Sequence, residues 1–181
     1  ERDELLPIID NILSTGQYIA GEAVETFEKD IAKLCDVRYV VTLNSGTDAL
    51  TLALHSVGVR AGDEVITPPN SFIASTGAIV HLGARPVFVD VRPDLNIDPQ
   101  RIEQAITEKT KAIMPVHLTG RIADMNRILA ISEKYDIPVI EDAAQAIGSK
   151  YENKPSGSFG KIGCFSVHPL KNLNACGDGG F

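Results

Sequence analysis

The chain has 181 residues, 44% of them hydrophobic and 23% charged, which is ordinary for a globular protein with a core of its own. Acidic residues outnumber basic ones by 24 to 17, so the net charge is -7 and the pI is near 5.0. This balance argues against nucleic acid or an anionic membrane as the main partner, because both would repel an acidic surface.

The sequence carries no targeting or metal-binding signal. No apolar run approaches the length of a membrane span, and the charged N-terminus lacks the pattern of a signal peptide. The cysteines have no metal-ligand spacing, and the histidines are scattered along the chain. We therefore expect reduced thiols, a cytoplasmic protein and no metal site.

Helices are predicted at the start of the chain and strands after them. Apolar residues recur at helical spacing over 2–13, and a second amphipathic helix is expected over 21–34. Asp98 and Pro99 are typical of a further helix start, and 123–135 has the pattern of another helix. We predict strands over 39–43, 64–67, 86–91, 112–117, 138–141 and 162–167. Strands that are almost wholly apolar and alternate with helices predict an α/β fold, with a parallel sheet covered on both faces.

Polar residues after the first strand form the first part of a candidate site, because open parallel sheets bind ligands at the carboxyl ends of their strands. Ser45, Gly46 and Thr47 stand there, and the first N–H groups of a helix beside a glycine could cradle a phosphate. Simple capping of that helix by Ser45 or Thr47 is the alternative.

An aromatic residue and a carboxylate follow two further strands. Phe72 could stack on a flat ring, with burial in the core as the alternative. Asp142 could pair with the cationic ring nitrogen of a cofactor, and a helix N-cap is the alternative. Its neighbour Glu141 is expected to point to the opposite side of the strand.

The last predicted strand is followed by side chains suited to chemistry with a carbonyl group. Lys171 can form an imine with an aldehyde if its amine loses its proton readily. Ser166 could bind phosphate, and His168 could orient groups or shuttle protons. The alternative for Lys171 is a solvated surface lysine.

The order and spacing of these motifs resemble those of the DegT/DnrJ/EryC1/StrS aminotransferase family. The resemblance rests on Asn44-Ser45-Gly46-Thr47, Glu141-Asp142-Ala143-Ala144-Gln145 and Ser166-x-His168-x-x-Lys171, with Gly177-Asp178-Gly179-Gly180 after them. The stretch from Gly16 to Gly21 also looks like the family's N-terminal signature, so the resemblance covers nearly the whole chain.

The resemblance implies the large domain of a fold-type-I aminotransferase that depends on pyridoxal 5'-phosphate, with a three-layer α/β/α architecture and a mainly parallel sheet. Residues 1–35 would be its N-terminal helical segment, and 36–181 the cofactor-binding large domain, cut before its last strand and without the small C-terminal domain. That last strand would start near Phe181 and run antiparallel between 162–167 and 39–43. We therefore expect this chain to be part of a longer protein.

Roles around the cofactor ring carry over by resemblance. Lys171 looks like the catalytic lysine, which forms the Schiff base with the cofactor and acts as general base. Asp142 resembles the partner of the pyridinium nitrogen, and Phe72 sits where the family often places an aromatic over the ring. Gln145 looks like the residue near the 3-hydroxyl.

The same resemblance places the phosphate of the cofactor. Gly46 and Thr47 resemble the phosphate-binding turn, helped by Ser166. Ser45 is a further candidate contact, and His168 matches the motif without an assigned role.

The implied reaction moves an amino group from an amino acid, expected to be glutamate, to the keto group of a nucleotide-linked sugar. Such a reaction serves the synthesis of deoxyamino sugars for cell-surface polysaccharides or glycosides. The resemblance also implies a homodimer whose subunits share the active site. Neither nucleic acid nor membrane is expected as a partner.

Other functions stay open at this point. Related sugar dehydratases carry histidine in place of the catalytic lysine, so Lys171 favours transamination. A protein that kept the fold and lost turnover is a second alternative, and relatives that act on cyclitol ketones or make aromatic amines leave the acceptor open. A nicotinamide-binding domain is excluded, because no predicted strand is followed by Gly-x-Gly-x-x-Gly.

Overall fold

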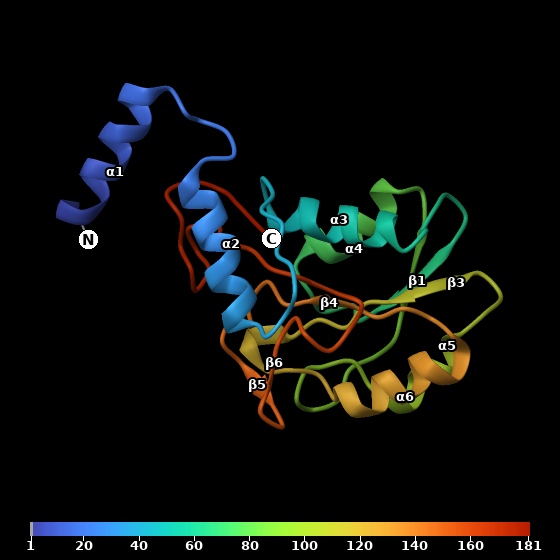
Figure 1. The fold of residues 1–181 in the computed structure, drawn as a ribbon. Helices are drawn as coiled ribbons and strands as arrows, with labels where there is room; N and C mark the ends of the chain where they lie inside the picture. The colour runs from blue at the N-terminus through green and yellow to red at the C-terminus, as the bar shows by residue number, and fades with distance from the viewer. Residues whose placement is uncertain (1) are drawn as a thin grey trace.

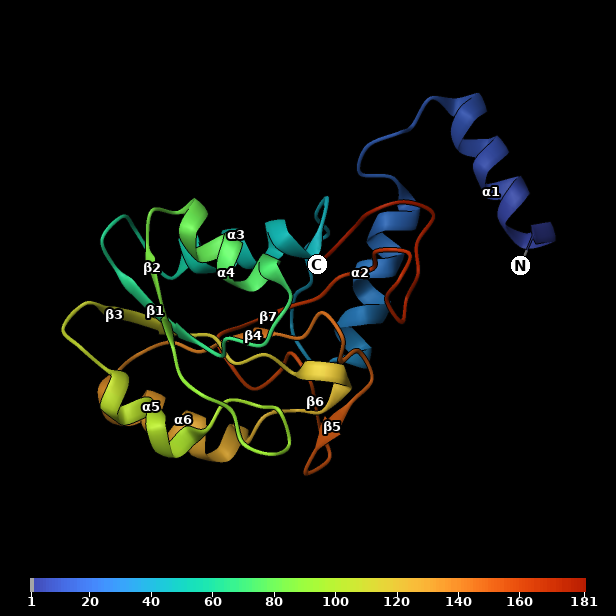
Figure 2. The ribbon, with the colours of Figure 1, turned by 180° about the vertical axis from the view of Figure 1, so that it is seen from behind.

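The centre of the molecule is a mainly parallel sheet with helices on both faces, seen in a computed structural model that describes residues 2–181 (Figure 1). Helices α3 (Gly46–Ser56) and α4 (Ile73–His81) lie on one face, and α5 (Pro99–Ala105) and α6 (Met125–Tyr135) lie on the other (Figure 2). The expected three-layer α/β/α fold is therefore confirmed.

The strands are short and are joined into one sheet by isolated bridges. They are β1 (Glu64–Thr67), β2 (Arg85–Phe88), β3 (Thr110–Ile113), β4 (Ile140–Asp142) and β7 (Ile162–Cys164). β1 lies between β2 and β3, β4 pairs with β7, and all these pairs are parallel. Parallel bridges from Ile113 to Val139 and from Val116 to Asp142 connect the two groups. The carboxyl ends of these strands therefore share one edge.

The end of the described chain enters the sheet in the opposite direction. Gly180 makes antiparallel bridges to both Leu43 and Ser166, which is the place expected for the last strand. Gly180 has to be glycine, because a Cβ there would lie 2.4 Å from the carbonyl carbon of Ser45. Gly180 therefore lies against Ser45 at the start of α3 and also pairs with Ser166, which follows β7. These two contacts hold the start of α3 beside the segment after β7.

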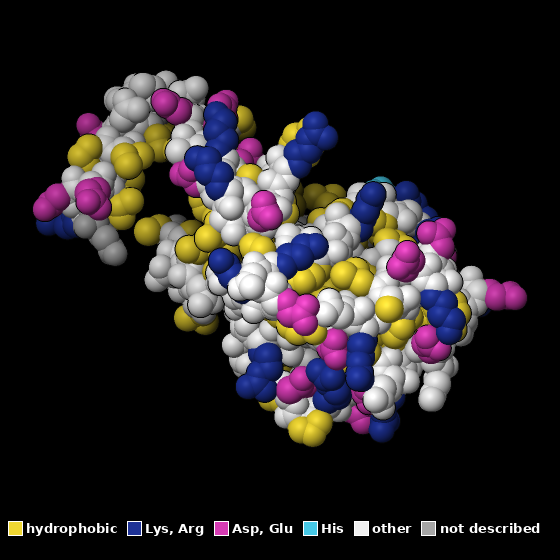
Figure 3. Space-filling view, turned by 60° about the horizontal axis from the view of Figure 1, so that its bottom comes forward, with side chains coloured by type: hydrophobic (Ala, Val, Ile, Leu, Met, Phe, Trp, Pro, Cys, Tyr) yellow, Lys and Arg dark blue, Asp and Glu magenta, His cyan; other side chains and the backbone are white. Residues whose placement is uncertain are grey.

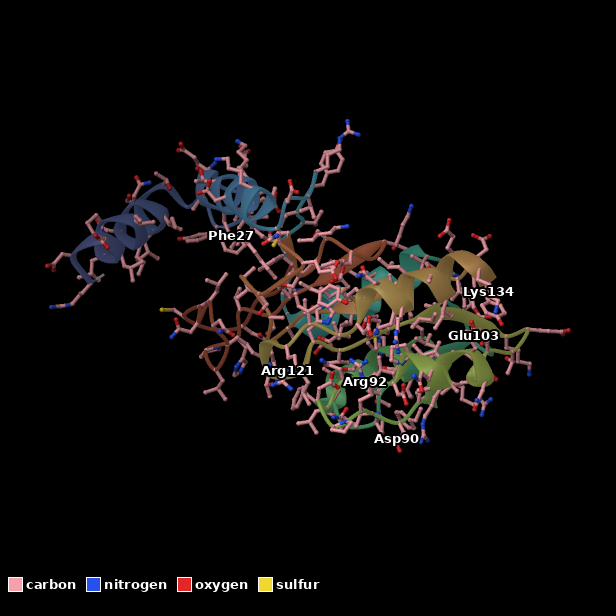
Figure 4. All side chains as sticks on the ribbon, turned by 90° about the horizontal axis from the view of Figure 1, so that it is seen from below. Phe27, Asp90, Arg92, Glu103, Arg121 and Lys134 are labelled. Carbon is pink, nitrogen blue, oxygen red and sulfur yellow. The ribbon has the colours of Figure 1, made fainter. Side chains whose placement is uncertain are left out.

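Apolar clusters lie on both faces of the sheet. Leu54 and Ile79 are fully buried on the α3–α4 side, and Ile102 and Ile128 on the α5–α6 side. Burial of an aliphatic side chain of this size stabilises the fold by about 1.5–3 kcal/mol. On the outer surface, Lys134 of α6 lies beside Glu103 of α5, 3.2 Å apart (Figure 4).

Several strand boundaries differ from the predicted ones. The predicted strand 112–117 is regular only as far as Ile113, because Pro115 has no N–H group to donate to a ladder. Within the predicted strand 39–43, Leu43 is the one residue that pairs with another described residue, its antiparallel partner Gly180. Residues 39–42 lie past the end of this short antiparallel ladder. The small hairpin of β5 (Lys150–Tyr151) and β6 (Lys154–Pro155) was not predicted.

The N-terminal helices behave differently from each other. α1 (Arg2–Thr15) extends away from the body (Figure 1) and buries no residue among those described. α2 (Glu22–Leu34) packs on the body, with Phe27 pointing inward (Figure 4) so that its ring lies 5.5 Å from that of Phe181. Both helices were expected, whereas the division at residue 35 stays a prediction.

The surface is mixed in charge. Figure 3 shows acidic and basic side chains intermingled on the face it presents, with no wide area of one sign. Within residues 2–181, no helix combines the length and the apolar character needed to cross a bilayer.

Candidate active site

One cavity of about 300 Å³ lies at the carboxyl edge of the sheet. It is lined by every residue that the sequence singled out for a site, namely Ser45, Gly46, Thr47, Phe72, Asp142, Gln145, Ser166, His168 and Lys171. The motifs come from four separate loops, and the parallel arrangement of the strands brings them to one place.

The start of α3 forms one end of the cavity. Ser45 is the N-cap and its hydroxyl accepts a hydrogen bond from Asp48 N–H at 3.0 Å, so the capping interpretation holds for Ser45. The N–H groups of Gly46 and Thr47 and the hydroxyl of Thr47 have no acceptor within residues 2–181. A helix start with unused donors attracts an anion, so this end of the cavity suits a phosphate group.

Gly46 permits a close approach between α3 and the segment after β7. A Cβ at Gly46 would lie 2.8 Å from the Cβ of Ser166 and 3.3 Å from the carbonyl oxygen of Phe165. The absence of a side chain therefore lets the hydroxyl of Ser166 stand beside the unused N–H groups of the helix start.

Asp142 lies at the centre of the cavity as a buried carboxylate that is only partly satisfied. Its side chain accepts hydrogen bonds from the Ser75 hydroxyl at 2.6 Å and from Ala144 N–H at 3.3 Å. Burial raises the pKa of Asp142, and the hydrogen bonds from Ser75 and Ala144 and the charge of Lys171 oppose that rise. No helix begins here, so the N-cap alternative is wrong.

Lys171 opens onto the same cavity as Asp142. Its side chain is half-buried, and its ammonium makes no hydrogen bond or ion pair with any residue of 2–181. Asp142 and Lys171 line the same cavity, so the two groups share one side of the sheet. The solvated-surface alternative for this lysine is therefore disfavoured by its position.

Gln145 and His168 each use one polar atom in a hydrogen bond within the chain, which determines which atom is available to a ligand. The amide oxygen of Gln145 accepts from Thr119 N–H at 2.7 Å, so its NH₂ group is the part available as a donor. Nδ1 of His168 accepts from Leu170 N–H at 3.1 Å, which leaves Nε2 to carry the proton of the neutral ring.

Phe72 is not a core residue. Its side chain is 69% exposed and lines the cavity, and it forms the N-cap of α4 without capping through its side chain. An exposed aromatic ring at a cavity wall is suited to cover a flat ligand rather than to stabilise the core.

Glu141 points away from the cavity, as predicted from strand alternation. Its carboxylate accepts hydrogen bonds from three backbone N–H groups, those of Gly157, Phe159 and Gly160, at 2.7–2.8 Å. It also lies 2.9 Å from Nε2 of His117, whose Nδ1 accepts from Ala123 N–H. His117 is fully buried in this pair and does not reach the cavity.

Two serines that the sequence analysis overlooked belong to the cavity wall. Ser71 and Ser75 line it, and their hydroxyl oxygens are 2.6 Å apart. Ser75 lies in the first turn of α4, and Ser71 stands just before the N-cap Phe72. Hydroxyl residues on either side of a helix start that follows β1 were the available signal.

A larger hollow of about 520 Å³ lies elsewhere, between the 39–43 segment and β7. Its walls are mainly aliphatic and aromatic side chains and glycines, without the convergent polar groups of the first cavity. Within residues 2–181, no three or more His, Cys, Asp and Glu side chains gather in a way that could hold a metal ion.

Comparison with known proteins gives relatives that span the whole chain. A UDP-N-acetyl-3-dehydro-alpha-D-glucosamine 3-aminotransferase of Acidithiobacillus ferrooxidans is 49% identical over 180 residues, which are 99% of this chain and 49% of that protein. The crystal structure of DesV from S. venezuelae in complex with a ketimine intermediate matches with a TM-score of 0.95 and 41% identity, covering 99% of this chain and 48% of that one. The structure of NtdA from Bacillus subtilis with bound cofactor PMP matches with a TM-score of 0.93 and 41% identity, over 98% and 40% of the two chains.

The match therefore concerns one part of a longer architecture. The chain spans about half the length of the curated relatives it matches. The sequence model of the DegT/DnrJ/EryC1/StrS aminotransferase family matches all of residues 1–181. With the fold, the matching structures and this full-length match in agreement, the chain belongs to the DegT/DnrJ/EryC1/StrS aminotransferase family.

Proposed function

We propose that this chain is the cofactor-binding part of an aminotransferase that uses pyridoxal 5'-phosphate. The observation that carries the proposal is the single cavity that holds an unpaired lysine, a buried carboxylate and the start of α3 with unused donors. The cofactor needs a group of each kind, for its aldehyde, its ring nitrogen and its phosphate.

The hydrogen-bond donors at the start of α3 are suited to the phosphate group of the cofactor. The N–H groups of Gly46 and Thr47, with the hydroxyls of Thr47 and Ser166, would hold the phosphate oxygens. Ser45 would act mainly through its backbone, because its hydroxyl already caps α3. His168 would add a donor through Nε2 at the same cavity.

The other residues that line the cavity are suited to the pyridine ring of the cofactor. Phe72 would cover one face of the ring, and the NH₂ group of Gln145 would donate to the ring oxygen at position 3. Asp142 would hold a proton on the ring nitrogen, because an ionised carboxylate beside that nitrogen stabilises its charged form.

Lys171 would carry the covalent and proton-transfer roles. When bound, the cofactor supplies the electron sink that makes the Cα–H of an amino acid acidic. Lys171 would hold the aldehyde carbon through its amine and, once released, take the proton from Cα of the amino donor. These roles require an amine that is not tied up by a partner, and Lys171 has no such partner within residues 2–181.

For the substrates we propose an amino acid, glutamate, as donor and a nucleotide-linked keto sugar as acceptor. The support is that relatives 41–49% identical are named for amino transfer on UDP- and dTDP-linked sugars. We further propose that the complete protein is cytoplasmic and works as a homodimer with a shared site, in line with the family resemblance.

The test is a titration of the complete protein with pyridoxal 5'-phosphate, followed by absorbance. We expect a band from lysine-bound cofactor, its loss on adding glutamate, and release of 2-oxoglutarate. A panel of nucleotide-linked keto sugars should then restore the band and yield aminated sugars.

Matched lysine variants make this test specific. Lys171→Ala should abolish the band, whereas Lys150→Ala should keep it, since Lys150 is exposed on β5 and does not line the cavity. A band that survives in Lys171→Ala contradicts the assignment of this lysine. A band that responds to no amino donor contradicts transamination.

A further inference from the structure

A chain of hydroxyl groups leads into the buried carboxylate of Asp142. Oγ of Ser75 lies 2.6 Å from Oδ2 of Asp142, and Oγ of Ser71 lies 2.6 Å from Oγ of Ser75. Ser75 is 1% exposed and Asp142 is 4% exposed, so water does not compete for these hydrogen bonds. Ser71 is half-buried and lines the cavity.

Hydrogen counting gives the direction of the chain. A hydroxyl has one hydrogen, and an ionised carboxylate has none to give. With Asp142 ionised, as its proposed role requires, Ser75 donates to Asp142 and Ser71 must donate to Ser75. Hydrogen bonds aligned in this way polarise each other, and a bond to a charged acceptor is stronger than a neutral one.

The second oxygen of Asp142 has a weaker partner. Among residues 2–181, Oδ1 accepts only from Ala144 N–H at 3.3 Å, which is long for a hydrogen bond to a carboxylate. Ser75 is thus the main group that compensates Asp142 for burial. The same short segment holds Phe72, which lines the cavity between the two serines.

We propose that Ser75 is a positioning residue that keeps Asp142 ionised and oriented for the cofactor ring nitrogen, with Ser71 as the outer donor. The inference rests on the proposed cofactor role of Asp142. A carboxylate that loses its hydroxyl donor becomes more basic, so it takes a larger share of the proton that it holds in common with the ring nitrogen. The ring nitrogen is then less fully protonated, and the cofactor is held less tightly.

The experiment uses the complete holoenzyme with pyridoxal 5'-phosphate labelled with ¹⁵N in the ring. The ¹⁵N chemical shift reports the protonated fraction of that nitrogen, which a purely structural change at Ser75 would leave alone. In Ser75→Ala we expect this fraction to fall, the cofactor Kd to rise about fivefold to tenfold and kcat to fall more than KM changes. Ser71→Ala should give a smaller shift in the same direction, of about twofold in Kd.

Conservative and neighbouring variants serve as controls. Ser75→Thr keeps a hydroxyl and should restore the ¹⁵N shift, and Thr76→Ala removes a hydroxyl from the next position of α4 and should change neither quantity. Thermal unfolding of each variant separates loss of fold from loss of positioning.

The outcomes of the two proposals are distinguishable. If wild-type protein binds no cofactor, the proposed function fails. A different result would overturn only the role of Ser75. In that case wild-type protein binds the cofactor and Asp142→Asn weakens cofactor binding, but Ser75→Ala keeps the wild-type ¹⁵N shift and Kd. A Ser75→Thr protein with wild-type stability that matches Ser75→Ala also contradicts it.

Discussion

Adjacent carboxylates on β4 serve opposite sides of the sheet. Glu141 is fully buried and is surrounded by donors, with three backbone N–H groups and the imidazole of His117. Asp142 is almost as buried, but its only donors in the described part of the chain are the Ser75 hydroxyl and one long N–H contact. Burial raises the pKa of Asp142, whereas Glu141 sits in a complete shell of donors.

The difference separates a structural group from a functional one. A buried carboxylate whose oxygens are all satisfied fixes the loops around it and gains nothing from a ligand. A buried carboxylate that lacks donors is less stable alone and gains from a cationic partner. The alternation of side chains along a strand lets one short segment carry both kinds.

The largest expected effect is on turnover at Asp142. In Asp142→Asn the amide can still meet Ser75 but cannot stabilise a positive ring nitrogen, so we expect kcat to fall about 10²–10³-fold with the fold retained. Steady-state kinetics of the complete protein with glutamate would check this. A variant within twofold of wild type would remove Asp142 from the site.

On the other side of β4, we expect Glu141→Gln to act on stability. The NH₂ group of the new side chain would face backbone N–H donors, so the free energy of unfolding should fall by about 3 kcal/mol. Denaturant unfolding measures it. Glu133→Gln, at an exposed position of α6, is the matched control and should change it by less than about 0.5 kcal/mol.

In cofactor-free protein, Asp142→Asn is expected to stabilise the fold slightly, which is opposite in sign to the effect of Glu141→Gln and smaller. The folded-state pKa of Asp142 is raised above its unfolded value, so its stability contribution is complete below the unfolded value of about 3.9 and is lost as pH rises through the folded value. At pH 7 the variant should therefore unfold about 2–4 °C above wild type. The gap should narrow as pH falls toward 4, and a gap that widens would contradict this account.

The smallest effect concerns thiol reactivity. Cys176 is exposed, whereas burial raises the pKa of Cys35 to about 11 and that of Cys164 well above its usual range. At pH 8 we expect a thiol reagent to label Cys176 and neither Cys35 nor Cys164, in wild type and in Asp142→Asn. Glu141→Gln should slowly expose the buried thiols through local opening, and mass spectrometry of labelled peptides would show whether it does.

Much of the site followed from the order of motifs along the chain. Lys171 and Asp142 stand after different strands, and a parallel sheet has to bring the carboxyl ends of its strands to one edge. The residues that the sequence did not point to are those whose role depends on a contact with a residue far away in the chain. Ser75 matters because it meets Asp142, which is 67 positions away, and nothing in the local sequence marks that contact.

The strand ends show the same limit on a smaller scale. Apolar runs located β1 to the residue, but β3 ended at Ile113, shortly before Pro115, and the 39–43 segment paired only at Leu43 among the described residues. A run of apolar residues indicates burial, whereas a regular strand also requires a neighbour with matching hydrogen-bond groups.

The sequence by itself determined the α/β class, the family resemblance and the residue types of the cavity, because these depend on periodicity and on the order of motifs. Only the tertiary structure decided that His117 belongs to the buried Glu141 pair rather than to the cavity, and that Asp142 is held by Ser75. The physical reason is that a side chain's protonation and orientation depend on the donors and charges packed around it, and packing joins residues that the chain keeps far apart.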